Sequence, residues 1–270
     1  MSNLRVSLIQ TALHWEDKKA NLEMLERKIN GIPDKPELIV LPEMFSTGFS
    51  MNKESLAETM DDHTVSWLRK TSAKRGAIIT GSIMAKDSVK GETKFYNRLI
   101  WMLPTGDFTF YDKRHLFAYG TEDKHFSAGN KRLIASVNGW KINLQICYDL
   151  RFPVWLRQSP KEKPAIAPEY DLLIVSANWP AARSLAWRTL LQARAIENQC
   201  YVIGVNRTGL DGKGLEYGGE SMVVGPLGDH IRLMGSEEEI FSHTLDREKL
   251  DNVRTQLPFW RDADTFFIQP

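Results

Sequence analysis

Two hydrophobic periods follow one another along the chain, one typical of strands and one typical of helices. Leu4–Gln10 alternates apolar and polar residues as a strand does, and Asp17–Ile29 carries apolar residues at helical spacing. Two further helices are expected over Val65–Lys74 and Ser184–Asn198. Short apolar or alternating runs between turn residues predict strands over Leu38–Leu41, Ala77–Met84, Asn97–Leu103, Phe108–Tyr111, Leu133–Val137, Lys141–Ile146, Leu172–Ser176, Tyr201–Val205, Ser221–Val224, Ile231–Met234 and Ile240–Leu245.

The connections between these elements indicate the fold class. Turn residues join Asn97–Leu103 to Phe108–Tyr111 and Leu133–Val137 to Lys141–Ile146, which predicts two hairpins, whereas helices separate other strands. This mixture favours an α/β fold with helices on the outer faces of two packed sheets or of one large mixed sheet. Because no repeat or Pro/Ser-rich linker interrupts the pattern, residues 1–270 are expected to form a single domain.

Composition and charge narrow the classes of function. The 270 residues are 42% hydrophobic and 26% charged, as in globular proteins, and the net charge of +1 gives no indication of nucleic acid or an anionic membrane as partner. No secretory signal pattern and no apolar run of membrane-spanning length is found, so we expect a cytoplasmic protein. The two cysteines are expected to be free thiols, and the scattered histidines argue against a zinc site.

Three reactive side chains follow three predicted strands. Glu43 comes after Leu38–Leu41, Lys113 comes just after Phe108–Tyr111, and Cys147 directly follows Ile146. Each alone has an ordinary structural interpretation: a solvated loop carboxylate, a surface lysine and a small buried cysteine. Together they form the set that amide cleavage requires, namely a nucleophile, a base and a cation.

The expected reaction passes through a thioester. Cys147 would attack the amide carbonyl while Glu43 takes its proton and passes it to the departing nitrogen. Lys113 and the backbone N–H of Tyr148 would stabilise the oxyanion. The cation and the start of a helix are also expected to favour a Cys147 thiolate. Water would then attack the thioester, and neither a metal nor an organic cofactor is needed.

The segments around Glu43, Lys113 and Cys147 resemble the three signature blocks of the nitrilase superfamily of carbon–nitrogen hydrolases. The similarity runs from Leu4 to about Leu245. It implies a Glu–Lys–Cys triad, a four-layer α-β-β-α sandwich and a homodimer. The aromatic tail, from about residue 251 to 270, is expected to pack at the subunit interface.

The resemblance also suggests auxiliary and substrate-binding residues. Glu122 matches a second glutamate that many members carry after the lysine, where it positions the lysine and the substrate. Residues 111–117 and 177–180 are similar to the omega-amidase branch, which acts on the terminal amide of 2-oxoglutaramate and 2-oxosuccinamate. An arginine suits the far carboxylate of such substrates best. Candidate substrate-binding residues are Phe117, Tyr119, Arg151, Asn178, Trp179 and Arg183, although a structural ion pair is an equal alternative for Arg151.

Other interpretations remain open at this point. The same chemistry could act on an N-carbamoyl amino acid, an aliphatic amide or a nitrile. A binding or scaffold protein on a hydrolase fold is an alternative of another class. A Cys–His hydrolase using His115 is a further one, but the flanking residues typical of papain-like enzymes are missing around Cys147. The glycines between Gly209 and Gly219 lack the Lys-Ser/Thr ending of a phosphate-binding loop.

Overall fold

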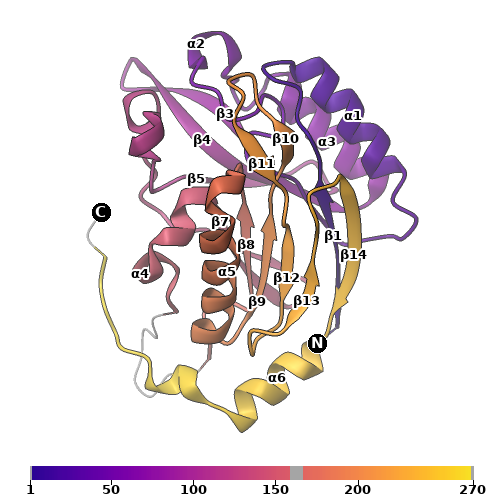
Figure 1. The fold of residues 1–270 in the computed structure, drawn as a ribbon, viewed down its shortest axis with the longest axis vertical. Helices are drawn as coiled ribbons and strands as arrows, with labels where there is room; N and C mark the ends of the chain where they lie inside the picture. Colours follow the sequence, from indigo (N-terminus) through magenta and orange to yellow (C-terminus); the bar gives the residue numbers. More distant parts are fainter. Residues whose placement is uncertain (1, 159–166, 269–270) are drawn as a thin grey trace.

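Two mixed six-stranded sheets form the centre of the molecule (Figure 1), as a computed structural model describes it for residues 2–158 and 167–268. The first sheet has the order β14-β1-β2-β3-β4-β5, with β1 (Leu4–Gln10), β2 (Leu38–Val40), β3 (Ile78–Val89), β4 (Glu92–Met102), β5 (Phe108–Asp112) and β14 (Glu239–Leu245). The second has the order β13-β12-β9-β8-β7-β6, with β6 (Ile134–Val137), β7 (Trp140–Ile146), β8 (Leu172–Ser176), β9 (Tyr201–Val205), β12 (Met222–Val224) and β13 (His230–Leu233).

Each sheet has a parallel centre. The strands β1, β2 and β3 pair in parallel in the first sheet, and β7, β8 and β9 do so in the second. Parallel strands end at the same edge of a sheet, so the segments that follow β7 and β8 emerge together. Residues Cys147 and Asn178 belong to those segments, and their register places Ile146 beside Ser176.

Helices cover the outer faces of both sheets. Helices α1 (Lys18–Asn30) and α3 (His63–Arg75) pack on the first sheet, and the long helix α5 (Ser184–Asn198) lies on the second (Figure 1). Leu22, Leu25 and Ile29 give α1 its buried face at helical spacing. The close approach of α5 requires Gly204 on β9, because a Cβ there would lie 2.5 Å from a methyl group of Leu191. The predicted α-β-β-α order is confirmed.

The inner faces of the sheets form the main core. Leu4, Val6 and Leu8 of β1 share one buried cluster with Ile142 and Leu144 of β7. Four predicted elements have the bounds of the observed ones, namely β1, β8, β9 and α5. Among the described residues, no helix has the length and hydrophobicity needed to cross a bilayer.

Away from the site, the largest differences from the prediction lie in two regions. Strands β3 and β4 continue beyond their apolar segments into a long hairpin that turns at Lys90 and Gly91, where polar residues hide the strand period. The chain after β14 forms α6 (Arg247–Gln256), on which the buried Arg254 donates to Asp171. The contact of residues 251–270 with a second subunit stays a prediction, and residues 269 and 270 lie outside the described ones.

Candidate active site

Cys147 lies at a sharp turn directly after β7. Its φ of 42° is in the left-handed region, and it begins the short 3-10 helix η3 (Cys147–Arg151). Asp149 fixes this turn, because its Oδ2 accepts hydrogen bonds from the Ile146 N–H at 3.1 Å and from the Tyr111 hydroxyl at 2.8 Å. The Cys147 sulfur is thereby held 3.7 Å from the carbonyl oxygen of Asn178.

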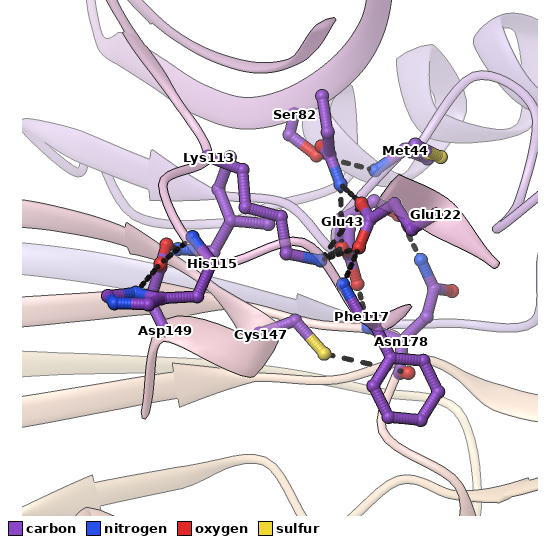
Figure 2. Close-up of polar contacts among 12 residues, drawn as sticks. Glu43, Met44, Ser82, Lys113, His115, Phe117, Glu122, Cys147, Asp149 and Asn178 are labelled. Atoms are coloured by element: carbon purple, nitrogen blue, oxygen red, sulfur yellow. Dashed lines mark hydrogen bonds and ion pairs between the residues drawn. The ribbon is translucent and has the colours of Figure 1, made fainter. Parts of the chain in front are cut away.

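Glu43 is positioned by the segment that follows β2. Met44 adopts a positive φ of 45°, and its N–H donates to the Ser82 hydroxyl on β3 at 2.8 Å. The Glu43 carboxylate is fully buried, and its Oε2 accepts a hydrogen bond from the Asn178 N–H at 2.8 Å. Asn178 therefore contacts both the carboxylate and the thiol, as Figure 2 shows.

Lys113 directly follows β5 and points toward two carboxylates (Figure 2). Its Nζ lies 2.8 Å from Glu43 Oε1 and 2.9 Å from Glu122 Oε2. Glu122 belongs to the short 3-10 helix η2 (Glu122–Lys124), and its Oε2 also accepts from the Phe117 N–H at 2.6 Å. All three side chains are buried. The structure thus brings Glu43, Lys113, Glu122 and Cys147 together, as predicted.

The side chain of Asn97 joins the three charged side chains of this cluster. The Asn97 Nδ2 on β4 donates to Glu43 Oε1 at 2.8 Å and to Glu122 Oε1 at 3.0 Å. Lys113 donates to the same two oxygens, at 2.8 and 3.1 Å. Two donors and two carboxylates therefore alternate in a closed arrangement, which we call the four-residue ring (Glu43, Asn97, Lys113 and Glu122). The sequence analysis did not identify Asn97.

Hydrogen bonding determines the charge of the ring. Every partner of the two carboxylates named above is an N–H donor, so both carboxylates are ionised acceptors. Burial alone would lower the pKa of Lys113, but the charges of Glu122 and Glu43 outweigh burial and raise the pKa of this ammonium. Burial raises the pKa of Glu122, an effect that Lys113 opposes. The ring carries one net negative charge.

The resting state of Cys147 differs from the prediction. Burial, followed by the charge of Glu43, raises the pKa of the Cys147 thiol well above its usual value. The charge of Lys113 lowers this pKa, but by less. The direction of this shift disfavours the expected thiolate, because one cation faces two carboxylates and a third negative charge is unfavourable. A base that removes the thiol proton during attack on a carbonyl would suit these surroundings.

A cavity of about 350 Å³ opens beside the sulfur. Cys147, Lys113 and Asn178 reach its wall, whereas Glu43 and Glu122 lie behind them. The cavity is also lined by Tyr148 and by the predicted substrate-binding residues Phe117, Tyr119, Arg151, Asn178, Trp179 and Arg183. The cavity is large enough for a small ligand with a polar group at each end.

Two arginines of the cavity wall lie over aromatic rings. The Arg151 guanidinium is 4.8 Å from the centre of the Trp179 ring, and that of Arg183 is 5.5 Å from the Phe117 ring. Within residues 2–158 and 167–268 neither makes an ion pair, so the alternative of a structural ion pair for Arg151 is wrong there. Both cations remain available to an anionic group in the cavity.

Part of the cavity wall comes from a segment predicted as a glycine-rich loop. Strands β10 (Thr208–Leu210) and β11 (Glu216–Gly218) form a small hairpin whose Asp211, Lys213, Leu215 and Tyr217 line the cavity. The Tyr217 hydroxyl donates to Asp211 Oδ2 at 3.2 Å, and the buried Arg207 lies 4.7 Å from the Tyr217 ring. Tyr217, an aromatic residue among glycines, could have indicated this part of the cavity wall, but the sequence analysis did not consider it.

His115 lies apart from the sulfur. Its Nδ1 is 2.8 Å from Asp149 Oδ1 (Figure 2). Its ring stacks on that of Phe152, with ring centres 3.7 Å apart. Asp149 also accepts from the His115 backbone N–H at 2.9 Å. These contacts hold the segment after Lys113 against the Cys147 turn, so the ring nitrogen in contact with Asp149 serves to position that segment.

The arrangement can activate a thiol and protonate a leaving group with the same carboxylate. Glu43 Oε1 carries two hydrogen bonds from the ring, whereas Oε2 is on the side of Asn178 and Cys147. A carbonyl in the cavity would meet the sulfur, the Lys113 ammonium and the Tyr148 segment together. Among the described residues, no group of three or more His, Cys, Asp or Glu side chains is arranged to hold a metal ion.

Comparison with known proteins places these observations in a family. The carbon-nitrogen hydrolase family profile matches residues 5–255. The chain is 41% identical to "Omega-amidase YafV" of Escherichia coli (strain K12), covering 98% of this chain and 99% of the relative. It is 32% identical to "2-oxoglutaramate amidase" of Bacillus subtilis (strain 168), with coverage of 95% and 96%. The crystal structure of a CN-hydrolase superfamily protein from Xanthomonas campestris, with an arsenic adduct in its active site, superposes with a TM-score of 0.94 at 40% identity over 100% of both chains.

Proposed function

Because the chain belongs to the carbon–nitrogen hydrolase family, we propose that it is an omega-amidase, which hydrolyses the terminal amide of 2-oxoglutaramate or 2-oxosuccinamate and releases ammonia. The observation that carries the proposal is the position of Cys147, whose sulfur faces a cavity beside a buried carboxylate–ammonium pair. A cavity that also presents two arginines without ion-pair partners among the described residues suits a substrate with a carboxylate.

The first half of the reaction forms a thioester. The Cys147 sulfur attacks the amide carbon while Glu43 Oε2 takes the thiol proton, and the carbonyl electron pair moves onto oxygen. Lys113 and the Tyr148 backbone N–H stabilise this oxyanion. The carbon–nitrogen bond then breaks as Glu43 returns the proton to nitrogen, and ammonia leaves.

The second half regenerates the thiol. Water attacks the thioester carbon while Glu43 takes one of its protons, and a second tetrahedral oxyanion forms at the same place. The carbon–sulfur bond breaks, the sulfur recovers a proton from Glu43, and the dicarboxylate product leaves. Glu122 holds Lys113 in place throughout by accepting its hydrogen bonds.

The substrate carboxylate is proposed to bind at the arginine end of the cavity. Arg183 and Arg151 offer guanidinium groups that can hold a carboxylate by two parallel hydrogen bonds. Phe117, Tyr119 and Trp179 form the aromatic part of the wall around the short carbon chain. We further propose that the protein acts in the cytoplasm as a homodimer, with residues 251–270 at the subunit interface.

The proposal is tested by ammonia release from 2-oxoglutaramate. Cys147→Ala is expected to abolish it. Cys200→Ala is the matched control, because this buried thiol directly precedes β9 and burial raises its pKa to about 12. Its loss should leave the rate near that of the wild type. Mass spectrometry of acid-quenched wild type should show the acyl group on the Cys147 peptide. Full activity in Cys147→Ala, or release of carbon dioxide instead of an acyl adduct, would contradict the proposal.

A further inference from the structure

We infer that Asn97 is a positioning residue of the proposed amidase, an inference that rests on the proposed function: its side-chain amide orients Glu43 for proton transfer and keeps two carboxylates stable beside one ammonium. Asn97 lies on β4 and is fully buried. It is bonded to both carboxylates of the four-residue ring, yet it does not reach the cavity wall.

The direction of the Asn97 amide is determined by its partners. Its Nδ2 has two carboxylate acceptors, at 2.8 and 3.0 Å, while its Oδ1 is buried and has no hydrogen-bond partner within the described chain. Reversing the amide would point an oxygen at two carboxylates. In the observed orientation one oxygen has no hydrogen-bond partner, but both N–H groups donate hydrogen bonds, one to Glu43 and one to Glu122.

Asn97 is connected to Lys113 at two places. Its backbone carbonyl accepts a hydrogen bond from the Lys113 N–H at 2.9 Å, which fixes the chain just after β5. Its side chain donates to the same Oε1 atoms that the Lys113 ammonium contacts. Substituting the side chain leaves the first contact intact and removes only the second, so the two roles can be separated.

The consequence for proton transfer concerns the two oxygens of Glu43. Two donors hold Oε1, one from Asn97 and one from Lys113, so Oε1 is fully engaged. Oε2 has the Asn178 N–H as its neighbour, and Asn178 also contacts the Cys147 sulfur. Asn97 therefore selects Oε2 as the oxygen that takes the thiol proton.

The charge balance gives Asn97 a second effect. The titratable groups around it are Glu43 after β2, Lys113 after β5, Glu122 on η2 and Cys147 after β7, with Tyr217 of β11 near Glu43. Without the two donated hydrogen bonds, the Lys113 ammonium alone compensates the charge of both carboxylates, so the carboxylates accept a proton more readily. The active form with both carboxylates ionised then requires a higher pH.

The test is the pH profile of kcat/KM for ammonia release. Asn97→Leu keeps the volume and removes both donors, and its acid limb should move up by about 1–2 pH units, the shift that loss of one charge-assisted hydrogen bond produces. Asn97→Asp keeps the shape, guards against misfolding of the leucine variant, and should move the limb in the same direction. Asn143→Leu replaces another fully buried asparagine, on β7 and outside the ring, and should leave the limb unchanged.

A second measurement does not need the proposed substrate. Alkylation of Cys147 by iodoacetamide, followed by mass spectrometry across pH, should reach its half-maximal rate at higher pH in Asn97→Leu than in wild type, because less positive potential faces the sulfur. The inference would be overturned if both Asn97 variants gave pH profiles with the same midpoints as the wild type, even if their rates were uniformly lower. Absence of ammonia release by wild type together with a shifted alkylation profile would refute the proposed function and leave the role of Asn97 supported.

Discussion

Replacing Lys113 with methionine tests whether the buried charges depend on one another. The substitution keeps the length of the side chain but removes the cation that lies 2.8 Å from Glu43 Oε1 and 2.9 Å from Glu122 Oε2. Both Oε1 atoms contact the same Asn97 nitrogen, so the carboxylates are close neighbours. Two unit charges about 5 Å apart repel by about 3 kcal/mol at an effective dielectric constant near 20. Breaking a buried ion pair typically costs about 3–5 kcal/mol.

The pH dependence of this loss has a definite sign. In the variant, the pKa of one carboxylate of the pair lies above its unfolded value, and burial already raises the pKa of Glu122 in the wild type. Stability from such a group is fully present below the unfolded pKa and is lost as the pH rises through the folded one. Lys113→Met should therefore lose about 3–5 kcal/mol at pH 8 and clearly less at pH 5, where one carboxylate takes up a proton.

Urea unfolding followed by tryptophan fluorescence at pH 5 and pH 8 measures this difference. Protein concentration must be held constant, because association contributes to the stability of an oligomer. Lys124→Met, which removes an exposed lysine from the same loop, is the control and should unfold like the wild type at both pH values. Equal unfolding midpoints for Lys113→Met and wild type at pH 8 would refute the reasoning, as would a loss that does not change with pH.

Two further substitutions separate alternative roles in the active site. His115→Ala should lower kcat/KM by less than about tenfold, since Asp149 keeps the backbone N–H of residue 115 as a partner, whereas a Cys–His hydrolase predicts a loss of at least about a thousandfold. Arg183→Met should raise KM for 2-oxoglutaramate by about 10–100-fold with little change in kcat, as expected when a charged hydrogen bond to the substrate is lost. The control is Arg188→Met, which removes a guanidinium that lies 3.7 Å from Glu220, and it should leave KM unchanged in steady-state assays. If both variants raised KM equally, the effect would come from the loss of positive charge in general and not from contact of Arg183 with the substrate.

The sequence predicted the strands and helices that are continuously apolar or strictly periodic. Leu172–Ser176 and Tyr201–Val205 are buried on both faces, so no polar residue blurs their bounds. The distal half of the β3–β4 hairpin was missed, since its residues alternate among charged and polar types with no buried face to mark the period. Helix α6 was missed for a similar reason, as only Leu250, Val253 and the stem of Arg254 are buried on it.

The positions of the proposed catalytic side chains were predictable because each follows a recognisable strand. Convergence of strand ends brings Glu43, Lys113 and Cys147 together without any information on side-chain packing. Asn97 was not predictable in this way, because it lies within a strand beside Arg98, and a polar residue there is usually taken to face solvent. The protonation state of the thiol also escaped prediction, since it depends on the net charge of groups whose positions only the fold supplies.

The small β10–β11 hairpin forms a part of the cavity wall that is separate from the four-residue ring. The proposed proton transfer involves buried side chains that are hydrogen-bonded to one another, namely Glu43, Asn97 and Lys113. The tip of the hairpin, from Asp211 to Leu215, is largely exposed and lines the cavity outside that network. The outer part of the cavity wall can therefore change through substitutions at Lys213 and Leu215 without disturbing the hydrogen bonds that join Glu43 to Asn97 and Lys113.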